Sequence, residues 1–363
     1  METWNNHSKI DLAKITATAA TTIREAMAMI NNRAILTMII VIDEKKTVKG
    51  TVTDGDIRRG LLRGLTLDAP IREIMNKNPI VVPYSIGREA MLELMRVNSI
   101  FHLPVIDAAG KLMGVEERLP SLADEAKDEL TAILMAGGEG QRLRPLTENT
   151  PKPMLEVCGK PILQILIECL RNYGFKKIII VTGYLGHVIE DYFKDGKDFK
   201  INIHYIREPQ RLGTAGALGI LPKELKPTRP FLVVNGDLMT NLNFRMFRDF
   251  HINGNYTFTL CGRPHKVEIP FGYPYVEGDL VTRFQEKPLF TYLVNSGIYS
   301  LSPELLNYVP VNKFFNMTEL IDLCIKDNKR VGLFPLGEEF HEIGRIDSYQ
   351  KAEQFYEKHL SHV

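Results

Sequence analysis

Hydrophobic positions in the first 120 residues follow two spacings. Apolar residues recur every three or four positions in "TIREAMAMINN" (22–32) and in "GREAMLELMRVN" (87–98), which predicts two amphipathic helices. Continuous apolar runs in "LTMIIVID" (36–43) and "IFHLPVID" (100–107) are typical of buried strands. Each run leads into a charged or glycine-containing turn and a second strand. The pattern therefore predicts two units of helix, strand, turn and strand.

The two units are copies of one another. The string "REAM" at 24–27 recurs at 88–91, and "VID" at 41–43 recurs at 105–107, in each case 64 residues later. A constant offset across helix-like and strand-like pieces indicates a duplicated supersecondary unit.

From about residue 131 the pattern changes to strands that alternate with helices. Apolar strands are expected at 130–138, 176–184, 201–208 and 230–237. Helices are expected at 160–174, where Gly174 ends the helix, and at 186–196 and 213–221. Such alternation predicts a mostly parallel sheet with helices on both faces and with ligands at the carboxyl ends of its strands.

We therefore expect two folded parts. Residues 131–363 should form an α/β domain of Rossmann-like type with a mostly parallel mixed sheet. An α+β pair at 10–122 should precede it, after an N-terminal tail at 1–9. The polar segment "SLADEAKDEL" (121–130) reads as a connector with or without helix, and we place the linker at 123–130.

Composition excludes several classes of function. The formal net charge is only +1, from 45 basic and 44 acidic residues, so no global field attracts nucleic acid or a membrane surface. The four cysteines show no C-x-x-C spacing, which favours a reduced protein over a disulfide framework or a zinc site. The first residues lack the apolar core of a secretory signal, and the longest apolar run is too short to span a membrane. We expect a cytoplasmic protein with neither a nucleic-acid nor a membrane partner.

The segment "ILMAGGEGQRLRPLTENTPKPML" (133–155) carries the clearest chemistry. Gly137, Gly138 and Gly140 follow a predicted strand, and glycines there let backbone N–H groups approach an anion without obstruction by Cβ. The loop is not a dinucleotide fingerprint, because Leu143 stands where a third spaced glycine is needed, and no G-K-[ST] closes it as a Walker A loop.

Two cations distinguish this loop from an ordinary tight turn. The planar guanidinium of Arg142 can hold phosphate oxygens, and Lys152 supplies a compact charge. Pro151 and Pro153 restrict the backbone on both sides of Lys152 and so lower the entropy lost in holding it. A solvated basic loop would not need that arrangement.

Asp237 ends the strand in "VVNGDLM". A carboxylate at a strand end can hold Mg²⁺ against phosphate oxygens, whereas an Asx-type turn uses the same residues. The residues alone do not decide between these interpretations.

Taken together, "LMAGGEGQRLRPLTENTPKPM" resembles the signature of the sugar-1-phosphate nucleotidyltransferases, and the likeness runs from about residue 131 to the end. Gln141 departs from it, since the family commonly has Thr there. The resemblance implies Mg²⁺ on Asp237 and catalytic roles for Arg142, on the triphosphate, and for Lys152, at the bond that changes. It implies nucleotide contacts from Met135, Ala136, Gly137, Gly138, Gly140, Glu208, Gly213 and Thr214.

The second metal ligand of the family is usually Asp in a "D-I-G-T-P" stretch. This chain has "HEIGRIDSYQKA", so Glu342 stands in that place and Arg345 replaces the small residue. Glutamate is one methylene longer, and the octahedral geometry of Mg²⁺ would then require a backbone adjustment or a bridging water.

The segments "PFGYPYVEGDLVTRFQEKP" and "VNSGIYSLSP" are similar to the family's sugar-binding segments. The likeness implies that Gly272 and Asn295 approach the hexose, that Glu286 accepts hydroxyl hydrogen bonds, and that Lys287 pairs with the sugar's phosphate. A surface ion pair in a turn is the alternative interpretation of Glu286 and Lys287.

The base is expected to be guanine. A carboxylate offers only acceptors, so Glu208 complements the adjacent N1–H and N2–H₂ donors of guanine better than uracil or thymine. The string "LGTAGAL" also looks more like the guanylyltransferase members of the family. A solvated strand end is the alternative interpretation of Glu208.

The N-terminal pair resembles a tandem CBS module. Its first copy ends "GTVTDGDIRRGLL", in which Thr53 and Asp56 match the ribose-binding pattern of that family. The second copy has Glu117 and Leu119 at the equivalent positions, and Leu119 cannot accept ribose hydroxyls. These residues fit either a module with one adenine-nucleotide site or a packing module without a ligand. Because such pairs often stack face to face, we expect a homo-oligomer.

The resulting hypothesis is an enzyme that transfers a nucleotidyl group to a hexose 1-phosphate and releases pyrophosphate. The favoured group is GMP, with GTP as its donor. The layout resembles the glucosamine-1-phosphate guanylyltransferases of bacterial legionaminic and other nonulosonic acid routes, which favours an amino-hexose. Mannose or heptose 1-phosphate, or a UTP- or dTTP-dependent enzyme acting on glucose 1-phosphate, stay open. Two alternatives belong to other classes of function. A catalytically silent, nucleotide-sensing subunit would be expected to lack Arg142, Lys152 or Asp237, and all three are present. An NAD-dependent oxidoreductase is disfavoured by Leu143.

Overall fold

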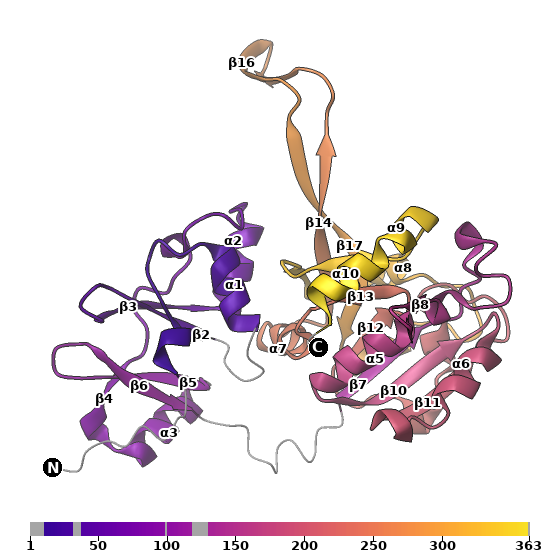
Figure 1. Cartoon of the computed structure of the whole chain (residues 1–363), viewed down its shortest axis with the longest axis horizontal. Helices are drawn as coiled ribbons and strands as arrows, with labels where there is room; N and C mark the ends of the chain where they lie inside the picture. Colours follow the sequence, from indigo (N-terminus) through magenta and orange to yellow (C-terminus); the bar gives the residue numbers. More distant parts are fainter. Residues whose placement is uncertain (1–10, 32–37, 99, 118–129, 362–363) are drawn as a thin grey trace. The chain divides into compact units, whose positions relative to one another are not determined.

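The computed structural model describes residues 11–31, 38–98, 100–117 and 130–361. The chain divides into two compact units, an N-terminal unit of Met1–Asp128 and a C-terminal unit of Glu129–Val363 (Figure 1). Among the described residues, no helix combines the length and the apolar character needed to cross a bilayer.

Two three-stranded sheets form the N-terminal unit, in the orders β1-β2-β3 and β4-β5-β6. The first copy contains η1 (Leu12–Lys14), β1 (Thr16–Ala17), α1 (Ile23–Asn31), β2 (Met38–Ile42), β3 (Val48–Thr53), α2 (Asp54–Leu62) and η2 (Ile71–Glu73). The second contains β4 (Val82–Pro83), η3 (Tyr84–Ile86), α3 (Arg88–Val97), β5 (His102–Ile106) and β6 (Leu112–Glu117).

The strand register confirms the duplication. Met38 pairs with Thr53 in the first copy, and His102 pairs with Glu117 in the second, so both members of the pair are shifted by the same offset. Both hairpins also carry a bulge at the corresponding position, after Val41 and after Val105. A shared bulge is evidence of common descent of the two copies, because bulges are specific features of a strand pair.

A seven-stranded sheet with the order β11-β10-β7-β12-β17-β14-β18 is the centre of the C-terminal unit. Its strands are β7 (Leu130–Met135), β10 (Phe175–Thr182), β11 (Asn202–Arg207), β12 (Phe231–Asn235), β14 (Phe258–Glu268), β17 (Leu289–Leu301) and β18 (Val331–Pro335). The first four strands in that order are parallel, β17 is antiparallel to both of its neighbours, and β14 and β18 are parallel. The predicted mostly parallel mixed sheet is confirmed.

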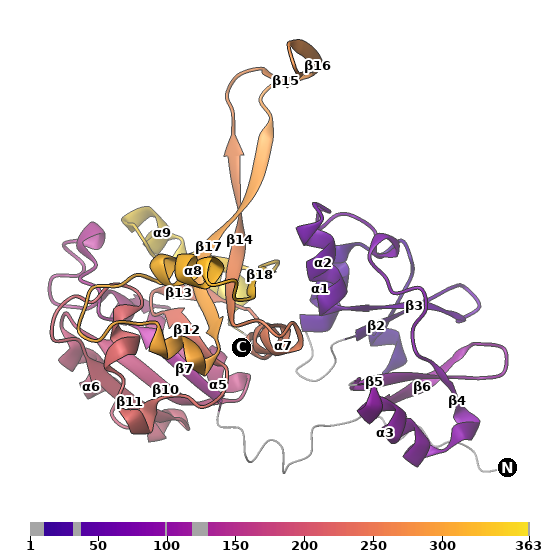
Figure 2. The same cartoon turned by 180° about the vertical axis from the view of Figure 1, so that it is seen from behind.

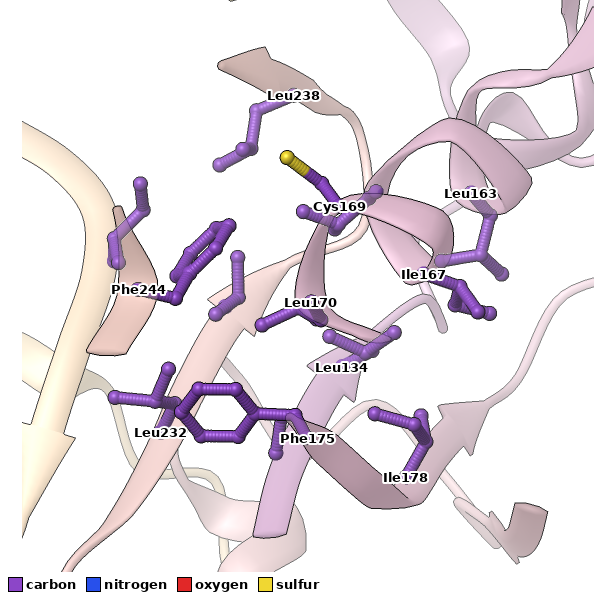
Figure 3. Close-up of a cluster of buried hydrophobic side chains, with 14 of the residues drawn as sticks. Leu134, Leu163, Ile167, Cys169, Leu170, Phe175, Ile178, Leu232, Leu238 and Phe244 are labelled. Atoms are coloured by element: carbon purple, nitrogen blue, oxygen red, sulfur yellow. The ribbon is translucent and has the colours of Figure 1, made fainter. Parts of the chain in front are cut away.

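Helices cover both faces of this sheet. They are α5 (Ile162–Asn172), α6 (Gly186–Phe193), α7 (Phe244–Asn253) and α8 (Met317–Lys326). Two further helices, α9 (Ile346–Gln350) and α10 (Ala352–His359), pack in a separate cluster with Leu155, Ile162 and Met239. Alternate residues of one strand enter different cores: Ile178 belongs to the cluster that includes residues of α5, α6 and α7, and its neighbour Ile179 belongs to the cluster that includes residues of α8. Figure 3 shows the first of these clusters, where Leu134 and Ile178 of the sheet lie beside Leu163, Ile167 and Leu170 of α5. Because both faces are buried, these strands are apolar throughout rather than alternating.

The helix expected at 213–221 was a wrong prediction. The segment forms only a short 3₁₀ turn, η7 (Gly216–Ile220). Its glycines lie against carbonyl groups of a neighbouring loop, since a Cβ would come within 2.7 Å of the Lys313 oxygen at Gly216 and 2.6 Å of the Pro310 oxygen at Gly219. Close packing between two loops, which the sequence pattern did not reveal, replaces the helix. The connector at 121–130 lies outside the described residues except for Leu130, which begins β7.

A long two-stranded ribbon projects from the body of the C-terminal unit (Figures 1 and 2). Strands β14 and β17 pair as far as Glu268 with Leu289, and β15 (Tyr273–Glu277) pairs with β16 (Leu280–Gln285) at the tip. We call residues 263–294 the arm. The sequence did not predict it, because its strands were assigned only as sugar-binding segments.

Candidate active site

The glycine loop lies where three parallel strands end. Met135 ends β7 and pairs with Val181 of β10 and Asn235 of β12. The amide of Ala136 donates to the Val181 carbonyl at 2.9 Å, and the amide of Gly236 donates to the Met135 carbonyl at 2.9 Å. The carboxyl ends of these strands therefore meet at one edge of the sheet, as predicted.

Gly137 is crowded on two sides. A Cβ at this position would collide with the carboxylate of Glu208 and would lie 3.4 Å from the amide nitrogen of Gly183. In turn, a Cβ at Gly183 would lie 2.7 Å from the Gly137 carbonyl oxygen. Only glycine fits here, because the strand ends approach each other backbone to backbone.

Gly140 brings the loop against the lysine. It has φ +64°, and a Cβ there would lie 3.1 Å from Cβ of Lys152. The buried Thr147 hydroxyl donates to the Gly140 carbonyl at 2.9 Å and closes the loop. Leu143, in the turn η4 (Gln141–Leu143), is fully buried and anchors the segment in the core. Leu143, whose presence excluded a dinucleotide fingerprint, is therefore a packing residue of the core.

Lys152 and Asp237 form an ion pair. Lys152 begins the turn η5 (Lys152–Met154), where Pro151 precedes it and buried Pro153 follows it. Asp237 follows β12 through Gly236, and both side chains are largely shielded from solvent. The structure therefore places the predicted lysine and the predicted metal ligand in direct contact.

Glu342 lies on the strand that pairs with the segment after Asp237. Strands β13 (Leu238–Thr240) and β19 (Phe340–Glu342) are antiparallel, with Leu238 opposite Glu342. The amide of Ile343 donates to the Asp237 carbonyl at 3.1 Å. The Glu342 carboxylate is 3.8 Å from the guanidinium of Arg263.

These two carboxylates fit Mg²⁺ better than they fit a metal enclosed by protein. Within the residues that the structure describes, no group of three or more His, Cys, Asp or Glu side chains could hold a metal ion. Mg²⁺ usually takes one or two carboxylates and completes its shell with water and substrate phosphate. Asp237, with Glu342 on the neighbouring strand, provides a donor set of that kind.

Arg142 faces an open pocket of about 420 Å³. The pocket is also lined by His341, Glu342, Gly344, Arg345, Asp347, Ser348 and Lys351. The Arg142 side chain is exposed and, among described residues, makes no ion pair or side-chain hydrogen bond. A guanidinium without a protein partner beside a cation-rich pocket is suited to an anionic ligand.

Glu208 follows β11 at the same sheet edge as the glycine loop. Its amide donates to the Thr182 carbonyl at 2.9 Å, and the Leu212 amide donates to its carboxylate at 3.4 Å. Burial raises the pKa of the Glu208 carboxyl, and the Leu212 amide and the Arg211 charge oppose that shift. Its contact with Gly137 places an acceptor next to the glycine loop.

Gly213 and Thr214 support the loop that follows Glu208. Gly213 has φ +83°, and a Cβ would lie 2.7 Å from the Phe315 carbonyl oxygen. The Thr214 hydroxyl accepts a 2.8 Å hydrogen bond from the Met317 amide at the start of α8. These contacts give both residues a structural role, in addition to the nucleotide contact predicted for them.

The residues predicted to bind the sugar phosphate are divided between body and arm. Asn295 lies at the base of the arm, where its amide group donates to the Tyr299 hydroxyl at 2.8 Å. Gly272, Glu286 and Lys287 lie together on the arm; a Cβ at Gly272 would be 3.0 Å from the Glu286 carboxylate. In the described part of the chain, no side-chain hydrogen bond or ion pair links these three with Arg142, Lys152 or Asp237.

Three basic residues, two that line this pocket and one that pairs with Glu342, received no role in the sequence analysis. Arg345 and Lys351 line the pocket of Arg142, and Arg263 pairs with Glu342. Arg345 and Lys351 belong to the segment of Glu342, whereas Arg263 comes from a distant strand and only the fold brings it there. The sequence singled out only Arg345 among them, because it replaces the small residue of the family's stretch.

In the N-terminal unit, Thr53 and Asp56 line a pocket of about 800 Å³ together with Arg59, Arg63 and Asn76. Thr53 caps α2, and its hydroxyl donates to the Asp56 carboxylate at 2.7 Å. The corresponding residue of the second copy, Glu117, lies 3.8 Å from the buried His102. Leu119 lies outside the described residues.

A glycine-lined strand edge that gathers cations and carboxylates is typical of α/β domains that bind phosphorylated ligands. Comparison with known families supports a narrower class. The nucleotidyl transferase family matches residues 131–359, so the chain belongs to that family. The CBS domain family matches residues 11–63 and 71–115.

Individual relatives include enzymes for different bases. A UTP–glucose-1-phosphate uridylyltransferase of Synechocystis is 28% identical over 61% of this chain and 62% of its own length. A mannose-1-phosphate guanyltransferase of Candida glabrata is 30% identical over 64% of this chain and 66% of its own length. The solved structure of HddC from Yersinia pseudotuberculosis has a TM-score of 0.50 and 26% identity, over 62% of this chain and 99% of that one. The chain thus spans less than two thirds of these two curated relatives.

Proposed function

We propose that the protein is a sugar-1-phosphate nucleotidyltransferase. A phosphate oxygen of the hexose 1-phosphate attacks the α-phosphorus of a nucleoside triphosphate. The bond between that phosphorus and the bridging oxygen breaks, and pyrophosphate leaves with its electron pair. Such chemistry depends mainly on positioning and on neutralising charge.

The observation that carries this proposal is the Lys152–Asp237 ion pair beside Gly140. It brings an ammonium and a carboxylate to the loop whose amides can bind phosphate. Lys152 would bind phosphate oxygens at the reacting bond, and Arg142 would offset charge on the departing pyrophosphate. Asp237 and Glu342 would hold Mg²⁺, which when bound supplies neutralising charge at the α-phosphate.

GTP is the proposed donor. The Glu208 carboxylate beside Gly137 provides the acceptors that guanine's adjacent donors require. Relatives named for guanylyl transfer and for uridylyl transfer both match this chain, so family membership leaves the base open. Glucosamine 1-phosphate is the first acceptor to test because of the CBS-linked layout. Mannose 1-phosphate is the second, since the Candida glabrata relative is named for it.

The test is a pyrophosphate-release assay with Mg²⁺ that crosses GTP, UTP, dTTP and ATP with glucosamine, mannose, glucose and heptose 1-phosphates. We expect the highest kcat/KM with GTP. Turnover with UTP or dTTP but not with GTP would show that Glu208 does not select guanine. Absence of pyrophosphate release in every combination would contradict the proposed activity itself.

For the N-terminal unit we propose one adenine-nucleotide site at Thr53 and Asp56. The support is the pocket that both residues line, in which Arg59 pairs with Asp56 and Arg63 is available to phosphate. Calorimetric titration with AMP, ADP and ATP should detect one site per chain. The exchange Asp56→Ala should abolish binding, whereas no binding by the unaltered protein would favour a packing module.

A further inference from the structure

The arm exposes an unusual amount of apolar surface. Its exposed large hydrophobic side chains are Val267, Phe271, Tyr273, Val276, Leu280, Val281, Phe284, Leu289, Tyr292 and Leu293. Phe271 and Leu280 are both 71% exposed. A two-stranded ribbon alone is only marginally stable in water, and a large exposed apolar patch marks an interaction surface. The arm is therefore suited to being covered by another surface.

That surface is not the body from which the arm emerges. Both views show the arm standing clear of its own body (Figures 1 and 2). Cross-strand pairing continues to Glu268, and aromatic contacts stiffen the ribbon, with Tyr273 and Phe290 at 5.3 Å between ring centroids. The ribbon presents its outer part away from the site instead of folding back over it.

The outer part of the arm also carries an organised polar group. Lys287 has φ +45°, in the left-handed region that non-glycine residues seldom adopt, and its amide donates to the Phe271 carbonyl at 3.2 Å. A Cβ at Gly272 would collide with Phe284 and crowd Glu286. The side chains of Glu286 and Lys287 are exposed, and among described residues neither forms an ion pair or a side-chain hydrogen bond. Strained backbone of this kind clusters at functional sites.

The body offers a complementary surface at the pocket of Arg142. Arg345 and Lys351 give it basic groups that can face the arm's Glu286, and Ile346, next to Arg345 in the sequence, exposes apolar surface. Arg263 at the arm base pairs with Glu342 of the same pocket, so the arm leaves the body beside the site. An arm that starts beside one pocket and reaches outward can meet the equivalent pocket of a second copy across a two-fold axis.

We infer that the arms of two copies are exchanged, so that Glu286 and Lys287 of one chain complete the sugar-phosphate site on the body of the other. This inference rests on the proposed function. Two negatively charged substrates must meet at the site, and Arg142 and Lys152 of the body are assigned to the triphosphate. Lys287 supplies a further ammonium for the second anion, and exchange of identical elements completes both sites at once.

Complementation between two inactive variants tests the exchange. Asp237→Asn disables the body, and Lys287→Ala disables the arm. Heterodimers are isolated after co-expression with two different tags, and pyrophosphate release is compared with that of each homodimer. If the arms are exchanged, the Lys287→Ala body receives an intact arm, and the heterodimer should recover about half of the unaltered activity.

Each other outcome is decisive. An inactive heterodimer made from two inactive homodimers would show that the arm acts on its own body and would overturn the exchange. An active Lys287→Ala homodimer would remove Lys287 from the site and would also overturn it. An unaltered protein without pyrophosphate release would contradict the proposed function, and the exchange would then be judged by the following measurement.

Amide hydrogen exchange gives a readout independent of activity. The variant Leu280→Ser with Phe284→Ser should speed exchange in residues 344–351 at the pocket, because it removes the docking arm. Val311→Ser changes a body residue that is 64% exposed and serves as the matched control. Equal exchange at 344–351 in both variants would overturn arm docking at this pocket.

Discussion

Lys152 and Asp237 are ion-paired although they are 85 positions apart in the sequence. One lies in a turn between two prolines, and the other follows a central strand of the sheet. Their relative solvent exposures are 13% and 21% for the side chains, so water screens each charge only partly. Each group therefore lowers the free-energy cost of removing the other's charge from water.

This pairing predicts a separation between stability and activity. Asp237→Asn should lower the free energy of unfolding by about 1–3 kcal/mol, because it leaves a shielded ammonium without its charged partner. Adding Lys152→Met should restore much of that loss but no pyrophosphate release. Urea unfolding of the two single variants and the double variant measures the coupling. Additive losses would show that the pair contributes nothing as a pair.

Arg142 should matter for rate and not for folding. We expect Arg142→Ala to reduce kcat by roughly 10²–10³-fold, the usual cost of removing a preorganised charge donor. Its unfolding midpoint should stay unchanged, because the side chain is exposed and has no described partner. Arg144→Ala alters a neighbouring exposed arginine that does not line the pocket and should be active. Full pyrophosphate release by Arg142→Ala would remove this residue from the mechanism.

Glu208 should control the choice of base. Glu208→Gln replaces one acceptor by a donor, so it should lower kcat/KM for GTP relative to UTP by about 10–100-fold, in line with the 1–3 kcal/mol of a good base contact. The measurement is the GTP to UTP ratio with one saturating sugar phosphate. Glu190→Gln, which alters a carboxylate paired with Arg207, is a control outside the site. An unchanged ratio would leave base selection to other groups.

Buried His251 should make the C-terminal unit less stable in acid. Its Nδ1 lies 2.9 Å from the Thr259 hydroxyl and its Nε2 lies 3.2 Å from the Ser302 hydroxyl. Burial lowers the pKa of His251 from 6.5 to about 4, so the unfolded chain binds a proton more readily. The stabilisation is complete above about pH 6.5 and is lost as the pH falls towards 4, by roughly 2 kcal/mol between pH 7 and 5.

Urea unfolding of the C-terminal unit at pH 7 and pH 5 checks this expectation. His251→Gln should flatten the pH dependence, because the glutamine amide does not titrate. His187→Gln, at an exposed histidine, should retain it. The same slope in all three proteins would assign the acid sensitivity to other groups.

The sequence predicted the elements whose physical cause is local. The copies at REAM and VID, the buried strand at 176–184 and the helix that ends before Gly174 all depend on periodicity and turn chemistry within one segment. The meeting of Met135, Val181 and Asn235 at one edge followed from the parallel arrangement.

Periodicity and turn chemistry within one segment could not predict contacts between distant segments. The expected helix at 213–221 gave way to loop packing against the carbonyls of Lys313 and Pro310. Arg263 joined Glu342 without any motif, because their proximity depends on the course of two strands. The arm was missed since a strand in a free ribbon and a strand in a sheet have the same alternating pattern.

The contact between Gly137 and Glu208 has a consequence for how this site can change. Under the proposed function, Glu208 meets the base and the loop of Gly137 meets the phosphates, and the Glu208 carboxylate lies directly against Gly137. A longer side chain introduced on either side of that contact would shift the other. Altering the preferred nucleotide therefore calls for substitutions elsewhere on the pocket, or for paired changes that keep the backbone of the glycine loop in place.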